Sequence, residues 1–403
     1  MSFLIPDSWS DNRKKTGATR HPWTLLLLSL FFLSSCGGSG GSSSPPLYKN
    51  QIPLTLSTNS NSNINTPVLS LTVCVPGTSN CQTIPDILLD TGSVGLRLSH
   101  SALSILLPQS TYQGQAVFEC FQFSSGDNFG PVVTADIRLG GEPTIHGLAV
   151  QISNSSIPSV PSQCSSLSSF SGSGINGILG VGYPFNQHDL GYYYLCPSAS
   201  WCSATYDLTY PKASMVSNPV FSLPTDNGGV LVTLPAIPQG GAPNISGTLT
   251  LGLDTQTDNQ TGGLTRFAID SQTTCGQSLY LSATYTGTSG TSCAFLDSGS
   301  NGMFFGTTTF PKCNNNPWYC PPPPPATISL SLAGANNVTG TYTLSVLNFD
   351  NYILTSSNLA WNDDAAPFGA STPPVFDAGL PFFFGRTVAV GFSINGQTPF
   401  WAF

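Results

Sequence analysis

Hydrophobic residues in this chain gather in short runs rich in β-branched and aromatic side chains, and helical spacing is nearly absent. Clusters of glycine, proline and asparagine separate the runs, as turns separate strands. The pattern predicts an all-β protein. The expected strands are Leu69–Val75, Ile84–Leu89, Val132–Leu139, Leu148–Ile152, Val230–Leu234, Leu249–Leu253, Leu264–Ile269, Ile328–Leu332, Tyr342–Phe349 and Thr387–Ile394.

Two segments about half a chain apart resemble each other. IPDILLDTGSVGLRL covers residues 84–98, and SCAFLDSGSNGMFF covers residues 292–305. Each is followed by an apolar segment that contains glycine, at residues 174–183 and 375–392. An internal repeat of this length predicts two lobes that arose by duplication and are related by a pseudo-two-fold axis.

Each repeat brings an apolar strand to an aspartate, Asp90 in the first copy and Asp297 in the second. Small residues follow, because a tight turn needs glycine and a carboxylate at the end of a buried strand needs hydroxyl partners. One such turn alone is compatible with a surface turn, but two at duplicated positions predict that the aspartates face each other. The supporting residues are Thr91, Gly92, Ser93, Ser298, Gly299 and Ser300.

Two carboxyl groups that face each other at close range cannot both ionise easily, so they share a proton. The ionised member can act as a general base on a water molecule, and the protonated member can donate to a carbonyl oxygen. This chemistry needs no cofactor and no metal. The sequence therefore indicates hydrolysis by water activated between Asp90 and Asp297.

Residues 67–403 resemble the pepsin-type aspartic peptidases. The resemblance rests on DTGS at 90–93, on DSGS at 297–300, and on GILG and DAGLPFF in the later apolar segments. It implies a bilobal double β-barrel with an interlobe cleft, a monomeric endopeptidase and a polypeptide substrate. We expect Asp377, within DAGLPFF, to be structural.

The resemblance also places a substrate-covering flap at FSSGDNFG, residues 123–130, with Asp127 at a solvated tip or against substrate. Phe123 stands where the family has a tyrosine, and Arg97 stands where it has the partner tryptophan. These departures favour a divergent branch, and they leave open a catalytically inactive protein that binds peptide or glycan. The flap and substrate candidates are Phe123, Ser124, Gly126, Asp127 and Arg97.

The first 36 residues have the pattern of an export signal, with a basic cluster at residues 13–15 and an apolar run at residues 25–33. The run is too short to span a bilayer as a helix. The ending LSSC resembles a bacterial lipobox and implies lipidation of Cys36 and an envelope lipoprotein, in the outer membrane of a two-membrane host. Ordinary secretion is the alternative.

The chain after the signal divides into three predicted parts. Residues 37–66 begin with a glycine- and serine-rich stretch and are expected to form a flexible tether. Residues 67–220 form the first lobe and residues 221–403 the second, with the boundary between Ala213 and Asn227.

Ten cysteines remain beyond Cys36, an even number that suits disulfides in an oxidising compartment. Sequence does not determine their pairing; we propose short loops for three pairs and leave the other four cysteines as two pairs. A zinc site is the alternative, but no CxxC motif is present and the histidines are scattered. The proposed pairs are Cys74–Cys81, Cys196–Cys202, Cys313–Cys320, Cys120–Cys164 and Cys275–Cys293.

Charge excludes one class of partner. Only 7% of the residues are charged, with 11 basic against 19 acidic ones, and no basic cluster follows the signal. Binding to nucleic acid depends on clustered lysine and arginine. The sequence therefore predicts no nucleic-acid partner and membrane attachment only through the lipid at Cys36.

Overall fold

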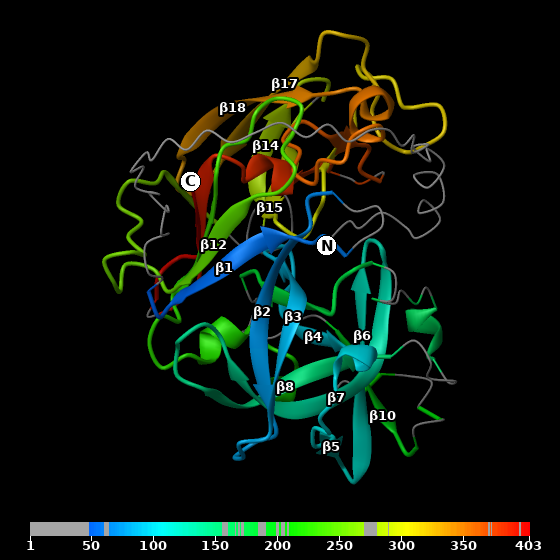
Figure 1. Cartoon of the computed structure of the whole chain (residues 1–403), viewed down its shortest axis with the longest axis vertical. Helices are drawn as coiled ribbons and strands as arrows, with labels where there is room; N and C mark the ends of the chain where they lie inside the picture. The colour runs from blue at the N-terminus through cyan, green and yellow to red at the C-terminus, as the bar shows by residue number, and fades with distance from the viewer. Residues whose placement is uncertain are drawn as a thin grey trace, which may run out of the picture.

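The computed structural model describes residues 48–59, 64–154, 160–165, 167, 170, 173–183, 191–198, 201–202, 206–207, 209–269, 280–288, 290–369, 371, 373–394 and 396–403. Cys36, Cys275 and the predicted signal lie outside these residues. The described chain is all-β, as predicted, and its two halves lie one above the other in Figure 1. No helix within the described residues is long and apolar enough to cross a membrane.

The first half contains a closed barrel. Its strands pair in the order β7–β8–β4–β9–β3–β2, and β2 pairs back onto β7, which leaves no free edge. The strands of this half are β2 (Pro67–Cys74), β3 (Cys81–Asp90), β4 (Val94–Ser99), β5 (Thr111–Tyr112), β6 (Gln115–Phe123), β7 (Gly126–Arg138), β8 (Ile145–Ser153), β9 (Gly177–Val181) and β10 (Tyr192–Cys196).

A second group of strands joins the two halves. From β2 the sheet continues through β1, β12, β11, β21, β22 and β13. These strands are β1 (Gln51–Leu56), β11 (Gly229–Leu234), β12 (Ser246–Leu251), β13 (Arg266–Ala268), β21 (Arg386–Gly391) and β22 (Phe400–Ala402).

Strand β1 corrects the predicted tether. Its side chains alternate between buried and exposed, and it pairs with β12 on one side and β2 on the other. Alternation of this kind marks a strand with one face on a core. The expectation of a flexible segment over residues 37–66 is therefore wrong from Gln51 to Leu56, where the chain joins the two lobes.

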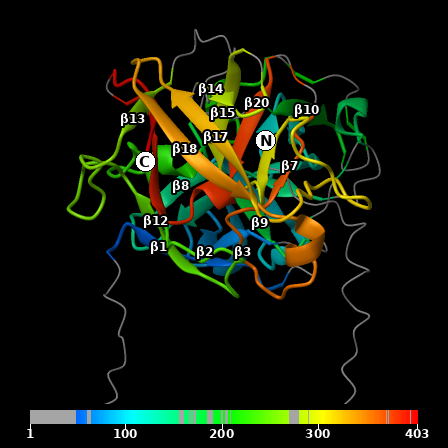
Figure 2. The same ribbon diagram turned by 90° about the horizontal axis from the view of Figure 1, so that it is seen from above.

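The second half is a half-barrel of seven strands in the order β18–β17–β14–β15–β20–β16–β19. Seen from above, β17 and β18 lie side by side across this half (Figure 2). The strands are β14 (Leu281–Tyr285), β15 (Ser292–Asp297), β16 (Met303–Phe305), β17 (Ala326–Ala333), β18 (Thr339–Val346), β19 (Ala365–Ala366) and β20 (Val375–Gly379).

Within the described ranges, helical structure is confined to single turns between strands. A five-residue π-turn, η8, covers Phe349–Ile353, so the predicted strand Tyr342–Phe349 ends early at Val346. The 3₁₀ turns are η3 (His100–Ala102), η4 (Ser162–Cys164), η6 (Lys212–Ser214), η7 (Pro219–Ser222) and η9 (Leu380–Phe382).

One hydrophobic core runs through both halves, from Leu54 in β1 to Trp401 in β22. Strands β9 and β20 are buried along their whole length, which suits parallel strands covered on both faces. The segment Tyr192–Cys196, which is not among the strands expected from the sequence, forms β10, and its Tyr193 and Tyr194 are buried.

Four predicted disulfides are present: Cys74–Cys81, Cys120–Cys164, Cys196–Cys202 and Cys313–Cys320. Cys293 is also disulfide-bonded. The predicted pair Cys275–Cys293 involves Cys275, which lies outside the described residues.

Candidate active site

Asp90 and Asp297 occupy equivalent places at the ends of two equivalent strands. Asp90 ends β3 and pairs with Gly180 of the parallel strand β9, while Asp297 ends β15 and pairs with Gly379 of the parallel strand β20. A Cβ atom at Gly180 would lie 2.7 Å from the amide nitrogen of Val94, and one at Gly379 would lie 2.0 Å from the carbonyl oxygen of Gly302. Glycine is therefore required where each inner strand passes beneath its turn.

The two turns make the same internal hydrogen bonds. The Gly92 amide donates to Asp90 Oδ1, and the Ser93 hydroxyl donates to Asp90 Oδ2 at 2.5 Å. In the second turn the Gly299 amide donates to Asp297 Oδ1, and the Ser300 hydroxyl contacts Asp297 Oδ2 at 3.0 Å. The sequence prediction that small hydroxyl residues hold the carboxyl groups is confirmed for Ser93 and Ser300.

Thr91 and Ser298 instead join one turn to the other. The Thr91 hydroxyl donates to the Leu296 carbonyl oxygen at 2.9 Å, and the Ser298 hydroxyl donates to the Leu89 carbonyl oxygen at 2.8 Å. Each hydroxyl also accepts the backbone amide of the other residue. This four-bond bridge is buried and sets the distance between the strands that carry the two aspartates.

The bridge brings the two carboxyl groups together. They are hydrogen-bonded to each other, and both side chains are 0% exposed. A Cβ atom at Gly92 would lie 2.4 Å from Asp297 Cγ, so only glycine admits the opposing carboxyl group. Burial first, and then the charges of Asp90 and Asp377, raise the pKa of Asp297 well above its usual value.

A third carboxyl group lies beside this pair. Asp377, on β20, is 0% exposed, and its Oδ2 is 2.7 Å from the Ser300 hydroxyl. Burial raises its pKa well above the usual value, against the effect of the Ser300 hydrogen bond, and the charge of Asp90 raises it further. The sequence predicts a structural role for Asp377; the structure shows that it is buried and hydrogen-bonded, and its contact with the dyad was not predicted.

The predicted flap is a hairpin formed by β6 and β7. Phe123 pairs with Gly126, so Ser124 and Ser125 form a two-residue turn, and Gly126 has a φ of 137°. Figure 1 shows the hairpin reaching from the first half toward the second. Phe123 belongs to a cluster of buried apolar residues of the first half that includes Leu88 and Ile178.

Asp127 does not behave as predicted. It is buried at 6% exposure, and its backbone forms an isolated bridge with Leu167. The expectation of a solvated tip at Asp127 is wrong, because the hairpin is only two residues wide at its turn and Asp127 already lies inside the paired strands. Ser124 is the exposed residue of the turn.

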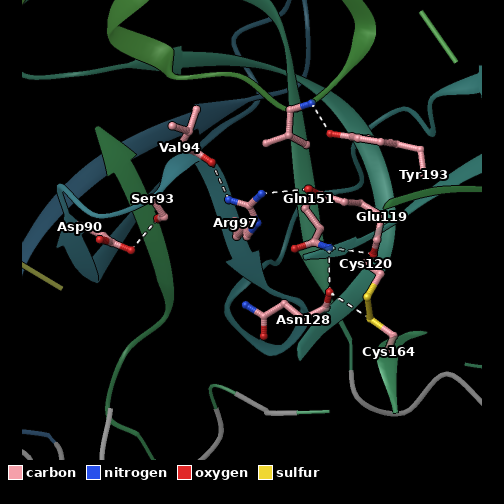
Figure 3. Close-up of polar contacts among 11 residues, drawn as sticks. Asp90, Ser93, Val94, Arg97, Glu119, Cys120, Asn128, Gln151, Cys164 and Tyr193 are labelled. Atoms are coloured by element: carbon pink, nitrogen blue, oxygen red, sulfur yellow. Dashed lines mark hydrogen bonds and ion pairs between the residues drawn. A yellow bond between two sulfur atoms is a disulfide. The ribbon is translucent and has the colours of Figure 1, made fainter. Parts of the chain in front are cut away.

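Arg97 lies beneath the hairpin, fully buried. Its guanidinium donates to Glu119 Oε1 at 2.8 Å and to the Val94 carbonyl oxygen at 2.7 Å, and it stacks 3.7 Å from the centre of the Phe121 ring. Figure 3 shows the polar contacts of Arg97 with Val94, beside the Asp90 turn, and with Glu119 on the hairpin strand β6. Arg97 therefore ties the Asp90 turn to the hairpin by a hydrogen bond to Val94 and an ion pair with Glu119.

Gln151 and Glu119 complete this connection and were missed by the sequence analysis. The Gln151 amide donates to the carbonyl oxygens of Glu119 and Asn128, one on each hairpin strand. Glutamate inside the apolar stretch VFECF was the available signal, since a charged residue is rarely buried without a partner.

One group of possible metal ligands occurs in the described chain, formed by Cys313, Cys320 and Asp350. The two sulfur atoms already form a disulfide, which removes the thiolates that a metal would need. The residues there do not fit a metal centre.

The sequence profile of a family described as "Protein of unknown function (DUF3443)" matches residues 46–403. The chain belongs to this family. No curated protein matches the chain. Among solved structures, the chain is similar to an aspartic proteinase from Irpex lacteus, with 19% identity, a TM-score of 0.54, and coverage of 87% of this chain and 96% of that one. This likeness shows that the DUF3443 chain has the bilobal pepsin-like fold.

Proposed function

We propose that this protein is an aspartic endopeptidase in which Asp90 and Asp297 activate a water molecule. The observation that carries the proposal is the pair of carboxyl groups hydrogen-bonded to each other across two turns with matching hydrogen bonds. A raised pKa at Asp297 favours a state in which one proton is held between the two groups.

The chemistry follows from that state. The ionised carboxylate takes a proton from water, while the protonated one donates its proton to the carbonyl oxygen of a peptide. The oxygen of the water bonds to the carbonyl carbon, giving a tetrahedral diol. Collapse of the diol returns a proton to the amide nitrogen and breaks the C–N bond. The Ser93, Gly92 and Gly299 donors keep the carboxyl groups oriented throughout.

The test is hydrolysis of an unfolded protein by the purified protein across pH 3–8. We expect cleavage that is strongest at acidic pH and lost in both Asp90→Asn and Asp297→Asn. Equal inertness of the wild type and both variants over this range would contradict the proposal. Since both carboxyl groups are buried, substrate must displace neighbouring residues to reach them.

A non-catalytic role is the second candidate, and the hairpin favours it. Phe123 is packed into the first lobe and Arg97 is committed to Glu119, so neither supplies the tyrosine–tryptophan hydrogen bond of the pepsin-type peptidases. In this case the protein binds peptide or glycan, and Asp90→Asn and Asp297→Asn bind as the wild type does. Binding measured by calorimetry with intact peptide separates the candidates.

We further propose that the protein is a lipoprotein of a bacterial envelope, attached through Cys36. Support comes from the sequence LSSC after an apolar run and from disulfides that suit an oxidising compartment. Labelled fatty acid should be incorporated by the wild type and not by Cys36→Ala. Labelling of both would contradict lipidation at this residue.

A further inference from the structure

Asp377, Ser300 and Asp297 form a continuous contact through one hydroxyl group. Ser300 Oγ is 2.7 Å from Asp377 Oδ2 and 3.0 Å from Asp297 Oδ2. A serine hydroxyl has one hydrogen to donate. If both carboxyl groups were ionised, one of these two close oxygen contacts would contain no hydrogen. One of the two carboxyl groups must therefore carry a proton and donate it to Ser300.

The proton belongs on Asp377 rather than on the outer oxygen of Asp297. Asp297 Oδ1 accepts the Gly299 amide, which supports a charged form, and its hydrogen bond to Asp90, which raises the pKa of Asp297, places the proton of Asp297 between these two groups. Asp377 Oδ1 is buried with no hydrogen-bond partner among the described residues. A buried carboxyl oxygen that lacks a hydrogen-bond donor favours the neutral form of its group.

The first lobe shows that the turn itself does not need this acid. Ile178 of β9 pairs with Leu88 and Arg97, as Asp377 of β20 pairs with Phe295 and Phe304. The position equivalent to Asp377 is therefore an isoleucine beneath the Asp90 turn, and that turn makes the same amide and hydroxyl bonds. Because the Asp90 turn keeps its hydrogen bonds above an isoleucine, the Asp297 turn does not need an acid at residue 377 to keep its own fold.

We propose that Asp377 is a positioning residue of the catalytic centre. As a neutral acid it donates a hydrogen bond to Ser300, and this directs the Ser300 hydroxyl to Asp297. As an anion it keeps the shared proton on the Asp90–Asp297 pair. This inference rests on the proposed peptidase function for its role in catalysis. The arrangement of three carboxyl groups and their protons stands without it.

The titratable groups that face Asp377 couple its ionisation to that of the dyad. Asp90 and Asp297 lie on one side, and Tyr280, whose pKa is raised by burial and then by Asp377, lies on another. Ionisation of Asp377 places a negative charge beside the Asp90–Asp297 pair. The new charge on Asp377 then opposes ionisation of the pair, which stays singly protonated to higher pH.

The test compares Asp377→Asn with the wild type in the pH dependence of kcat/KM on a peptide substrate. The asparagine amide can still donate to Ser300 but cannot become an anion. We expect the alkaline limb of the profile to move about one pH unit lower, as loss of one neighbouring charge does for a buried carboxyl pair. Asp377→Ile, which copies the first lobe, should move it in the same direction.

Asp363→Asn is the matched control, since Asp363 is a buried carboxyl group with a pKa raised by burial to about 7 and no hydrogen bond to the dyad turns. It should leave the alkaline limb in place. A lower rate for Asp377→Asn at every pH, without movement of the limb, would overturn the proposal and leave only a structural role.

A second readout does not need activity. Carbon-13 NMR of labelled aspartate carboxyl groups should show, in the wild type, two protons retained within the cluster after exposed aspartates have ionised. Asp377→Asn should remove one and lower the pKa of the other by about one unit. If no substrate is cleaved but this coupling is seen, the peptidase function fails and the carboxyl cluster stands. If Asp377 titrates as an ordinary aspartate, independent of Asp297→Asn, the inference fails whatever the activity.

Discussion

The Asp90 turn and the Asp297 turn make matching internal hydrogen bonds, but the charged residues beside them differ. In the first lobe the strand after the turn carries Arg97 and the inner strand carries Ile178; in the second lobe the same places hold Phe304 and Asp377. The first turn is thus tied by a cation to the hairpin through Glu119, and the second is joined through Ser300 to a third acid. The two halves share the geometry that holds the two carboxyl groups, and they differ in the charged residue that lies beside each turn.

The largest expected effect is a loss of peptidase activity, and it tests whether the Asp90 turn and the Asp297 turn are equally needed for the reaction. Asp90→Asn and Asp297→Asn should each lower kcat by about 10²–10⁴-fold, because general acid and base act in the same step. Peptide hydrolysis at the pH of maximum rate measures it. A variant that retains most of its activity would show that only one turn carries the chemistry.

The next largest effect is a loss of folding stability on substitution of Arg97, and it concerns the first lobe alone. Arg97→Met removes one partner of a fully buried ion pair and should lower the free energy of unfolding by about 3–5 kcal/mol. Denaturant unfolding measures the coupling energy between the two side chains when Arg97→Met, Glu119→Leu and the double variant are compared. The double variant should recover part of the stability that Arg97→Met loses. Arg266→Met, at a half-exposed ion pair, is the control, with an expected cost below about 1 kcal/mol. Equal costs at Arg97 and Arg266 would contradict the assigned role.

The bridge between the lobes should respond less. Thr91→Val removes a buried hydroxyl that donates to Leu296 and accepts from Ser298, leaving both partners unsatisfied at a cost of about 1–3 kcal/mol. Thr91→Ser keeps the hydroxyl and should stay closer to the wild type. Thermal unfolding measures both, and indistinguishable midpoints for Val and wild type would show that the bridge does not hold the lobes.

The smallest expected effect is on the pH dependence of the folding stability. Asp297 and Asp377 have folded-state pKa values above their unfolded values, so the folded protein holds these protons more tightly. Their contribution is complete below about pH 4 and is lost as pH rises through the folded pKa values. Melting temperature between pH 4 and 8 should therefore fall less steeply in Asp377→Asn than in the wild type. Parallel slopes would mean that Asp377 is ionised throughout.

Much of the fold could be predicted from the sequence because its signals are local or repeated. Short apolar runs between turn residues located strands such as β2, β8 and β17, and the duplicated DTGS and DSGS identified the aspartates that the structure joins. Strand β1 was missed because the glycine- and serine-rich stretch before it hid a six-residue alternation. Tyr192–Cys196 was missed because two nearby cysteines suggest a loop as readily as a strand.

By itself the sequence determined that this chain is built from strands, that it is duplicated, and that each half ends a strand on an aspartate. Those features follow from side-chain periodicity and turn chemistry, which act over a few neighbouring residues. Only the tertiary structure decided that Glu119 meets Arg97 and that Asp377 meets Ser300, 77 positions earlier in the chain. The register of strand pairing brings such distant residues together. The energetic cost of burying their charges depends on the side chains that surround them in the fold, which no local sequence pattern specifies.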